Sequence, residues 1–259
     1  MTLLDETPGG ASMQSLEQIA LLVRNCSDCP LSVGRTNSVP GEGNSQAKVM
    51  FIGEGPGYYE DQHGRPFVGR TGKLLDRLLA SIDLVREDVF IANMVKCRPP
   101  SNRDPVTSEI AACTKYLDRQ IELINPKVIV TLGRFAFARY FPGEGITKAR
   151  GQVRKKDGRL IFPVLHPAAV LRREDLSPTM IEDFKAISAI LADETEDIGP
   201  EPGSDSPEAD QTADEEAQLS FVDARGRLNV GLANAEISTA TAEVISHEEE
   251  SRPEQLALF

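Results

Sequence analysis

The chain has 259 residues, 40% of them hydrophobic, and a formal net charge of −12 at pH 7. Its length allows one large domain or two. The charge is uneven, because residues 1–194 carry 25 Lys and Arg against 24 Asp and Glu, whereas residues 195–259 carry 3 against 16. An acidic protein is a poor partner for nucleic acid, but a nearly neutral body of this kind does not exclude one.

Residues 1–12 are predicted to form a flexible leader. The segment LEQIALLV, residues 16–23, has the spacing of a short amphipathic helix, and residues 29–47 are rich in loop-forming residues. KVMFI, residues 48–52, predicts a buried strand. Residues 73–82 place four leucines at helical spacing, which predicts a helix that packs on a sheet.

Strands and helices continue to alternate beyond residue 82. Residues 89–95 and 127–132 predict two more strands, and residues 107–124 predict a helix with Thr107 as its cap. A short helix is expected over residues 134–140. The Asp157-Gly158 turn predicts a hairpin from Val153 to a strand at residues 160–165, and a helix over 178–191 follows. The alternation indicates a three-layer α/β/α fold with a central, mainly parallel, four-stranded sheet.

The periodic pattern stops after Ala192. Residues 195–220 contain nine acids, no bases and three prolines, and this composition buries too little apolar surface to offset chain entropy. We therefore expect one folded domain over residues 13–194 and a disordered acidic linker over residues 195–254. Apolar runs have only strand length, and the N-terminus lacks the pattern of a secretory signal, so we expect a cytoplasmic protein without a membrane partner.

The stretch GEGPGYYEDQHGRPFVGRTG, residues 53–72, follows the first strand and contains six glycines. A glycine-rich loop between a strand and a helix is typical of a pocket floor at the carboxyl edge of an α/β sheet. The stretch matches neither of the phosphate-binding glycine patterns, and Glu60-Asp61 at its centre would repel phosphate. It better suits a flat, mostly neutral ligand that stacks on Phe67. The alternatives are a plain connection and, for the two acids, a solvated loop edge.

Cys26 and Cys29 form a C-x-x-C pair, and Cys97 and Cys113 follow further along the chain. A cytoplasmic protein has little use for structural disulfides, so the four cysteines favour a metal site. Their spacing alone leaves three alternatives, which are an iron–sulfur cluster, tetrahedral zinc and unliganded thiols.

Four motifs occur in order along the chain: the glycine-rich stretch, IANMVKCRPP (residues 91–100), HPAAVLR (residues 166–172) and the spaced cysteines. Together they resemble the family-4 uracil-DNA glycosylases, the iron–sulfur branch of that superfamily, over about residues 20–192. The resemblance implies a catalytic domain that carries a [4Fe–4S] cluster on Cys26, Cys29, Cys97 and Cys113. This cluster would tie the N-terminal helix to the segment after Asn93. The enzyme would work at the nucleoid.

The resemblance also assigns roles to pocket residues. Cleaving a base from DNA requires extrusion of the base, recognition of its edge and stabilisation of the charge that develops. Phe67 would stack on the uracil. The amide of Asn93 both donates and accepts, so it matches uracil O4 and N3–H and rejects cytosine. His166 would donate a hydrogen bond to uracil O2 that strengthens in the transition state. A buried structural histidine is the plainer interpretation.

Further pocket residues follow from the same motif. Glu54 is expected to position or activate water and to stabilise the sugar cation. Gly53 is expected at the substrate, and Gly55 is expected to contribute only its backbone where the family-1 enzymes have an aspartate. Glu60 is expected to form a pocket wall that excludes the thymine methyl.

Contacts to DNA are expected at two places. The densest basic stretch would bind phosphates and comprises Lys148, Arg150, Arg154, Lys155, Lys156 and Arg159. The alternative for this stretch is a solvated face of the hairpin. By resemblance, Leu171 and Arg172 would enter the duplex and fill the gap left by the extruded nucleotide.

The chain ends in QLALF, residues 255–259, which resembles the bacterial sliding-clamp-binding pentapeptide and departs from it at Ala257. Gln255 would hydrogen-bond at the rim of a hydrophobic groove that Leu256, Leu258 and Phe259 fill. A chance match is the alternative. A flexible linker of about sixty residues would give the peptide a reach of roughly 40–45 Å from the body.

The expected function is therefore that of a monomeric, monofunctional repair enzyme. It would hydrolyse the N-glycosidic bond of deoxyuridine in single- and double-stranded DNA, release uracil and leave an abasic site. One alternative is a relative that binds uracil-DNA and traps it covalently, although the first motif reads GEGPGY rather than GEQPGD and the basic insert of those proteins is missing. The other is a non-catalytic iron–sulfur adaptor of the clamp.

Overall fold

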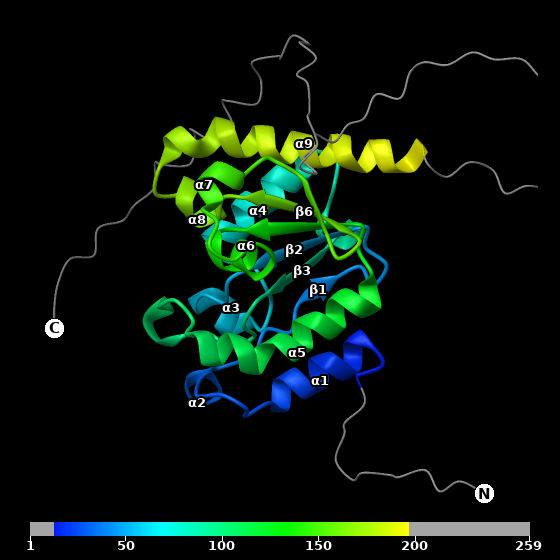
Figure 1. The fold of residues 1–259 in the computed structure, drawn as a ribbon. Coiled ribbons are helices and arrows are strands. Elements are labelled where there is room, and N and C mark those ends of the chain that lie inside the picture. The colour runs from blue at the N-terminus through cyan, green and yellow to red at the C-terminus, as the bar shows by residue number, and fades with distance from the viewer. Residues whose placement is uncertain (1–12, 197–259) are drawn as a thin grey trace, which may run out of the picture. The chain divides into compact units, whose positions relative to one another are not determined.

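The computed structural model describes residues 13–196 (Figure 1). The leader, most of the acidic linker and the pentapeptide at residues 255–259 lie outside the described residues, so their expected roles stay predictions. The expected alternation of strands and helices is confirmed. No helix among the described residues is long and apolar enough to span a bilayer.

A twisted sheet forms the centre of the fold, and its strand order is β1-β3-β2-β4-β6-β5. The four central strands are parallel and comprise β2 (Val49–Gly53), β3 (Phe90–Asn93), β4 (Val128–Leu132) and β6 (Arg159–Val164). The expected four-stranded parallel centre is therefore present. Two short antiparallel edge strands, β1 (Glu42–Gly43) and β5 (Arg154–Lys156), extend it to six strands within the described residues.

Helices α4 (Arg70–Ala80), α8 (Pro167–Val170) and α9 (Ser177–Glu196) cover one face of the sheet (Figure 1). The alternation of side chains along β2 explains this layer, because Val49 and Phe51 point to this face whereas Met50 and Ile52 point to the other. Phe51 stacks on Phe184 of α9 with ring centroids 5.9 Å apart. The first face is thus sealed by a continuous hydrophobic cluster.

The opposite face is covered by α5 (Thr107–Ile124) and α6 (Arg134–Tyr140). Helix α1 (Leu16–Asn25) packs on the outside of α5, and α2 (Leu31–Gly34) follows it. A separate small cluster, which includes Ile19, Val23 and Tyr116, joins these helices around the four cysteines. The N-terminal segment therefore forms an outer layer that rests on the cysteine site.

Two local predictions are wrong. Thr107 does not cap α5 but is its first residue; the cap position is Val106, whose N–H donates to the Glu109 carboxylate at 2.9 Å. The stretch of residues 53–72 is not loop throughout, because it contains α3 (Tyr58–His63), which Gly64 ends in the left-handed conformation. Helix α4 then begins at Arg70, three residues before the expected start.

The register of the parallel strands fixes where the site can form. Gly53 at the end of β2 lies beside Asn93 at the end of β3. Strands β4 and β6 end at Leu132 and Val164, shortly before Arg134 and His166. All four carboxyl ends therefore meet at one edge of the sheet, where α/β proteins commonly bind ligands.

Candidate active site

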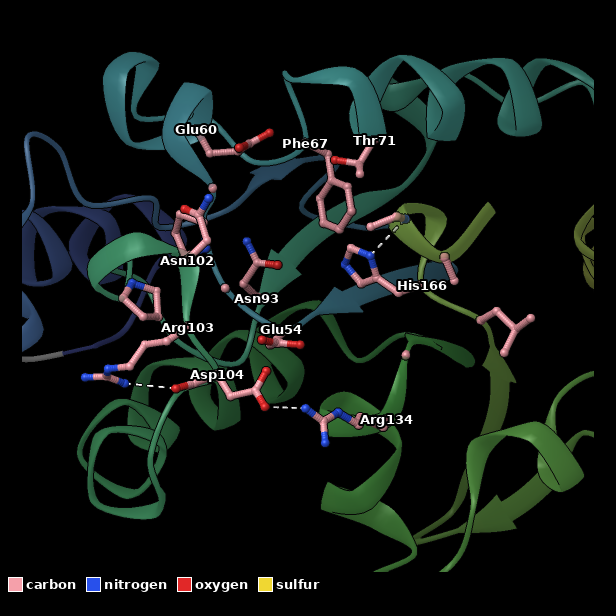
Figure 2. Close-up of a pocket in the computed structure, with 18 of the residues that line it drawn as sticks. Glu54, Glu60, Phe67, Thr71, Asn93, Asn102, Arg103, Asp104, Arg134 and His166 are labelled. Atoms are coloured by element: carbon pink, nitrogen blue, oxygen red, sulfur yellow. Dashed lines mark hydrogen bonds and ion pairs between the residues drawn. The ribbon is translucent and has the colours of Figure 1, made fainter. Parts of the chain in front are cut away.

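A cavity of about 540 Å³ opens at this edge of the sheet (Figure 2). Seven of the residues expected at the substrate or the DNA line it: Glu54, Gly55, Glu60, Phe67, Asn93, His166 and Arg172. Sequence reasoning missed other lining residues, which include Thr71, Asn102, Arg103, Asp104, Arg134 and Ile146. Asn102, Arg103 and Asp104 follow the motif that ends at Pro100, with only Ser101 between them. Their position next to this motif is the sequence signal that could have identified them as pocket residues.

Gly53 allows two side chains of the cavity to approach the backbone. A Cβ atom at this position would lie 2.4 Å from Asn93 Oδ1 and 2.7 Å from Phe67 Cζ. Both distances are shorter than any tolerated contact, so the amide and the aromatic ring occupy the space of the missing side chain. The role of Gly53 is therefore to let these two groups converge.

Phe67 is held in the left-handed region, with φ of 51°, which costs free energy for a bulky residue. Arg86 donates to the carbonyls of Pro66 and Phe67, and its guanidinium also pairs with Glu42 and Asp76 at 2.6 Å each. These contacts hold the ring in place. The ring stacks against His166, with centroids 5.9 Å apart and planes inclined by 29°.

Helix α4 leaves room for this conformation because its third residue is glycine. A Cβ atom at Gly72 would lie 1.7 Å from the Phe67 carbonyl oxygen. Any side chain at this position would therefore displace the carbonyl that Arg86 holds. Arg86 and Gly72 were not identified from the sequence.

Asn93 is 2% exposed, and its side-chain Oδ1 is buried without a hydrogen-bond partner in the described part of the chain. A buried acceptor without a partner is rare and costly, so this oxygen is available to accept from the N–H of a ligand in the cavity. Its backbone, in contrast, is anchored: the Asn93 carbonyl accepts from Lys96 Nζ at 3.1 Å. Lys96 is 1% exposed and also donates to Gln120 Oε1 at 2.7 Å. Burial lowers the pKa of Lys96 to about 8.

His166 caps the N-terminus of α8, where its Nδ1 accepts from the Ala168 N–H at 3.1 Å. A ring nitrogen that accepts carries no proton, so the neutral ring has its proton on Nε2. Burial lowers the pKa of His166 to about 4, and the nearby Arg172 guanidinium adds to this effect. The imidazole is therefore a neutral hydrogen-bond donor toward the cavity (Figure 2).

Glu54 lies on the cavity floor opposite the ring of Phe67 (Figure 2). Burial and the neighbouring Asp104 carboxylate raise the pKa of Glu54, and Arg134 opposes the shift. Asp104 and Arg134 form an ion pair with each other at the rim. A carboxylate with a raised pKa is a better proton acceptor, which suits a group that orients or deprotonates water.

Glu60 and Asp61 are both buried, so the interpretation of this pair as a solvated loop edge is wrong. Glu60 Oε1 accepts from the N–H groups of Val68 and Gly69 at 3.0 and 2.9 Å. Asp61 Oδ1 accepts from the Thr36 N–H at 2.9 Å. Both carboxylates therefore face inward: Glu60 holds the segment that follows Phe67, and Asp61 holds the segment at Thr36.

The basic stretch around the β5–β6 hairpin lies outside the lining of the cavity. Its arginines are held by the protein: Arg150 pairs with Asp183 at 2.6 Å, Arg154 with Glu144 at 2.7 Å, and Arg159 donates to Asn125. Its lysines, Lys148, Lys155 and Lys156, are exposed. Leu171 packs partly on the core, whereas Arg172 is exposed at the cavity. Their contacts to DNA remain predictions.

The four cysteines line a second cavity, between α1, α2, α5 and the segment after β3. All four thiols are free. Arg35 Nη1 donates to Cys97 Sγ at 3.1 Å, and the Lys96 N–H donates to Cys113 Sγ at 3.2 Å. Burial raises the pKa of Cys97, and that of Cys113 to about 11. Donors aimed at sulfur suit thiolates, and buried thiolates require a bound cation.

In the described part of the chain, no group of three or more His, Cys, Asp or Glu side chains is arranged so that it could hold a metal ion as it stands. The four thiols share one cavity, and their residue types suit both tetrahedral zinc and an iron–sulfur cluster.

We expect His166 to remain neutral well below pH 6. Because its folded-state pKa of about 4 lies below the unfolded value near 6.5, the neutral ring stabilises the fold above pH 6.5, and this contribution is lost as the pH falls toward 4. Histidine NMR should show an Nε2–H tautomer that does not titrate between pH 8 and pH 5. The free energy of unfolding of a His166→Gln variant should depend less on pH over this range. A ring that titrates near 6.5 would contradict the expectation.

Comparison with known proteins agrees with the site. The family model of the uracil DNA glycosylase superfamily matches residues 40–191. The type-4 uracil-DNA glycosylase of Sulfurisphaera tokodaii is 50% identical over 185 residues, which cover 68% of this chain and 84% of that protein. That of Saccharolobus solfataricus is 49% identical over 190 residues, which cover 70% and 88%.

One solved structure, the crystal structure of wild-type Pedobacter heparinus SMUG2, matches with a TM-score of 0.39 and 14% sequence identity, over 58% of this chain and 77% of that one. The two type-4 enzymes named above share about half of their aligned residues with this chain. The chain belongs to the type-4 uracil-DNA glycosylases of the uracil DNA glycosylase superfamily.

Proposed function

We propose that this glycosylase hydrolyses the N-glycosidic bond of deoxyuridine in single- and double-stranded DNA, releases uracil and leaves an abasic site for base excision repair. The observation that carries the proposal is the buried, unpartnered Oδ1 of Asn93. Uracil N3–H is a donor of the kind this oxygen needs, and the amide nitrogen can donate to uracil O4 at the same time. Cytosine presents the reverse pattern and would leave the buried oxygen facing an acceptor.

His166 supplies the group that stabilises the leaving uracil. As the glycosidic bond lengthens, negative charge develops on uracil O2, and the hydrogen bond donated by the neutral Nε2–H becomes stronger. Burial and the neighbouring Arg172 guanidinium keep the ring uncharged, so the ring stabilises the anion as a neutral hydrogen-bond donor. Phe67 holds the ring of the base in stacking contact beside His166.

Glu54 acts on the sugar side of the reaction. It orients the attacking water and stabilises the positive charge on the sugar, and its raised pKa suits it to accept a proton from water as the bond to C1′ forms. Glu60 and Gly57 form the wall that excludes the thymine methyl. Their contact is close, since a Cβ at Gly57 would lie 2.7 Å from Glu60 Oε2.

Replacing Asn93 should weaken catalysis on uracil. Asn93→Ala removes both edge contacts, so kcat/KM on a uracil-containing oligonucleotide should fall by about 10²- to 10³-fold. Excision is measured by treating the oligonucleotide with enzyme and then with hot alkali, which cleaves at abasic sites. Asn25→Ala, an exposed change on α1, is the matched control and should leave the rate unchanged.

The same assay separates the rival activities. If the wild-type enzyme leaves the strand uncleaved, uracil excision is rejected, and a non-catalytic adaptor remains as the alternative. A protein–DNA adduct that survives denaturant would instead show covalent trapping. Wild-type activity with an undiminished Asn93→Ala variant would reject only the role of the amide.

We propose further that Cys26, Cys29, Cys97 and Cys113 hold a [4Fe–4S] cluster, which type-4 enzymes typically carry. The observations in support are the cavity that the four cysteines share and the N–H donors on two of the sulfurs. When bound, the cluster joins α1 to the segment that follows Asn93. Its contribution is structural, because the cysteines lie apart from the residues that line the uracil cavity.

Removing one cysteine should reduce both metal content and stability. Anaerobically purified wild-type protein should contain iron and acid-labile sulfide in equal amounts, about four of each per chain. Cys113→Ser should lower both contents and the temperature of unfolding. Ser32→Ala, in the same cavity but without a sulfur, should retain them. Zinc without sulfide in the wild-type protein would overturn the assignment.

We also propose that residues 255–259 bind a bacterial sliding clamp through Gln255, Leu256, Leu258 and Phe259. The pentapeptide lies outside the described residues, so the sequence alone supports this proposal. Deleting the five residues should abolish clamp binding, measured by surface plasmon resonance, and leave excision on a short oligonucleotide intact. Undiminished clamp binding by the truncated chain would reject the proposal.

A further inference from the structure

The outer surface of α3 carries two large exposed aromatic side chains. Tyr58 is 52% exposed and Tyr59 is 56% exposed, and their rings meet edge to face with centroids 5.4 Å apart. Neither ring belongs to a hydrophobic cluster of the described fold, and neither hydroxyl has a hydrogen-bond partner within that fold. Packing therefore does not account for these side chains.

The electrostatic character of this surface differs from what the sequence indicates. Glu60 and Asp61 of the same helix are buried and bind backbone N–H groups, so their charges face the interior. The outer side of α3 presents tyrosine, glutamine and histidine instead. A surface that seemed acidic from the sequence is free of exposed carboxylates along this helix.

A cation lies directly beside the tyrosines. The guanidinium of Arg98 sits 5.1 Å from the centre of the Tyr58 ring, and its Nε donates to Asn102 Oδ1 at 2.7 Å. Arg98 forms no ion pair with any carboxylate in the described part of the chain, and its two terminal nitrogens have no acceptor there. Exposed aromatic rings next to an unpaired arginine are the combination that binds single-stranded nucleic acid, because bases stack on the rings and phosphates pair with the cation.

Neighbours of these three residues line the cavity. Gly57 and Glu60, on either side of the tyrosines in sequence, do so, as does Asn102, to which Arg98 is bonded. A strand whose uridine has entered the cavity must leave its mouth, so a nucleotide next to the uridine passes over part of the surrounding surface.

We propose that Tyr58, Tyr59 and Arg98, which we term the α3 platform, bind the nucleotide adjacent to the extruded uridine in the same strand. The base of that nucleotide stacks on the tyrosines and a flanking phosphate pairs with Arg98. This inference rests on uracil excision and adds to it a subsite on single-stranded DNA, where no complementary strand holds the neighbouring base. It is separate from the lysines of the β5–β6 hairpin.

The first test combines protein and substrate changes. On single-stranded oligonucleotides, Tyr58→Ala/Tyr59→Ala should lower kcat/KM by about 5- to 100-fold, mainly through KM, since one base loses its stacking partner. Tyr58→Phe/Tyr59→Phe retains both rings and should retain activity. Leu21→Ala, at 57% exposure on distant α1, is the control for loss of an exposed apolar side chain.

Substrates that lack a single base locate the subsite. An abasic spacer is placed in turn at each of the two positions on either side of the uridine. When the spacer replaces the nucleotide that binds the platform, the rate of the wild-type enzyme should fall to that of the alanine variant. The rate of the alanine variant should not fall further with the same substrate. Arg98→Ala should reduce the slope of log KM against log salt by about 0.7, the value for one phosphate contact on a single strand.

Two results would overturn the proposal. One is an alanine variant as active as wild type on single strands. The other is a deficit of equal size at every spacer position, which would indicate general damage rather than a lost stacking contact. Wild-type excision on the same oligonucleotides tests the underlying activity separately, so a failure of the platform does not count against the function.

Discussion

The site depends on the close approach of two strand ends at Gly53. Strands β2 and β3 pair in a register that sets Gly53 beside Asn93, and the missing side chain leaves room for the amide of Asn93 and the ring of Phe67. In the proposed function, the amide binds the edge of the base and the ring stacks on its face. Both groups then depend on one backbone position at the end of β2.

The supports of these groups converge from several parts of the fold. Lys96 donates to the backbone carbonyl of Asn93 and is held by Gln120 of α5, and the Lys96 N–H donates to the sulfur of Cys113. The buried residue Lys96 thus contacts both the cysteine site and Asn93. On the other side, α8 fixes the tautomer of His166, and Arg86 fixes the backbone of Phe67. Rigid elements hold each functional group, which is the condition for preorganised catalysis.

Sequence patterns predicted the fold class and the convergence of Phe67, Asn93 and His166, because strand ends and motif residues are local signals. They did not reveal Arg86, Lys96 or Arg134, since the importance of these residues arises from contacts with residues distant in sequence. Thr107 was taken for the cap because threonine favours that position, but the helix begins at Thr107, and the Glu109 carboxylate accepts from the N–H of the cap residue Val106. For the acids of α3, a solvated loop edge stayed open as an alternative to a pocket wall, because sequence does not show which way a short helix faces.

Glu42 lies in the two-residue edge strand β1, among residues that would ordinarily count as tolerant surface. Its carboxylate pairs with Arg65 and Arg86, and Arg86 in turn grips the backbone of Phe67. The outermost strand of the sheet is thus a structural tether for the stacking ring. A substitution at Glu42 would release one anchor of Arg86 and so loosen the backbone of Phe67, which makes this peripheral carboxylate part of the support of the cavity.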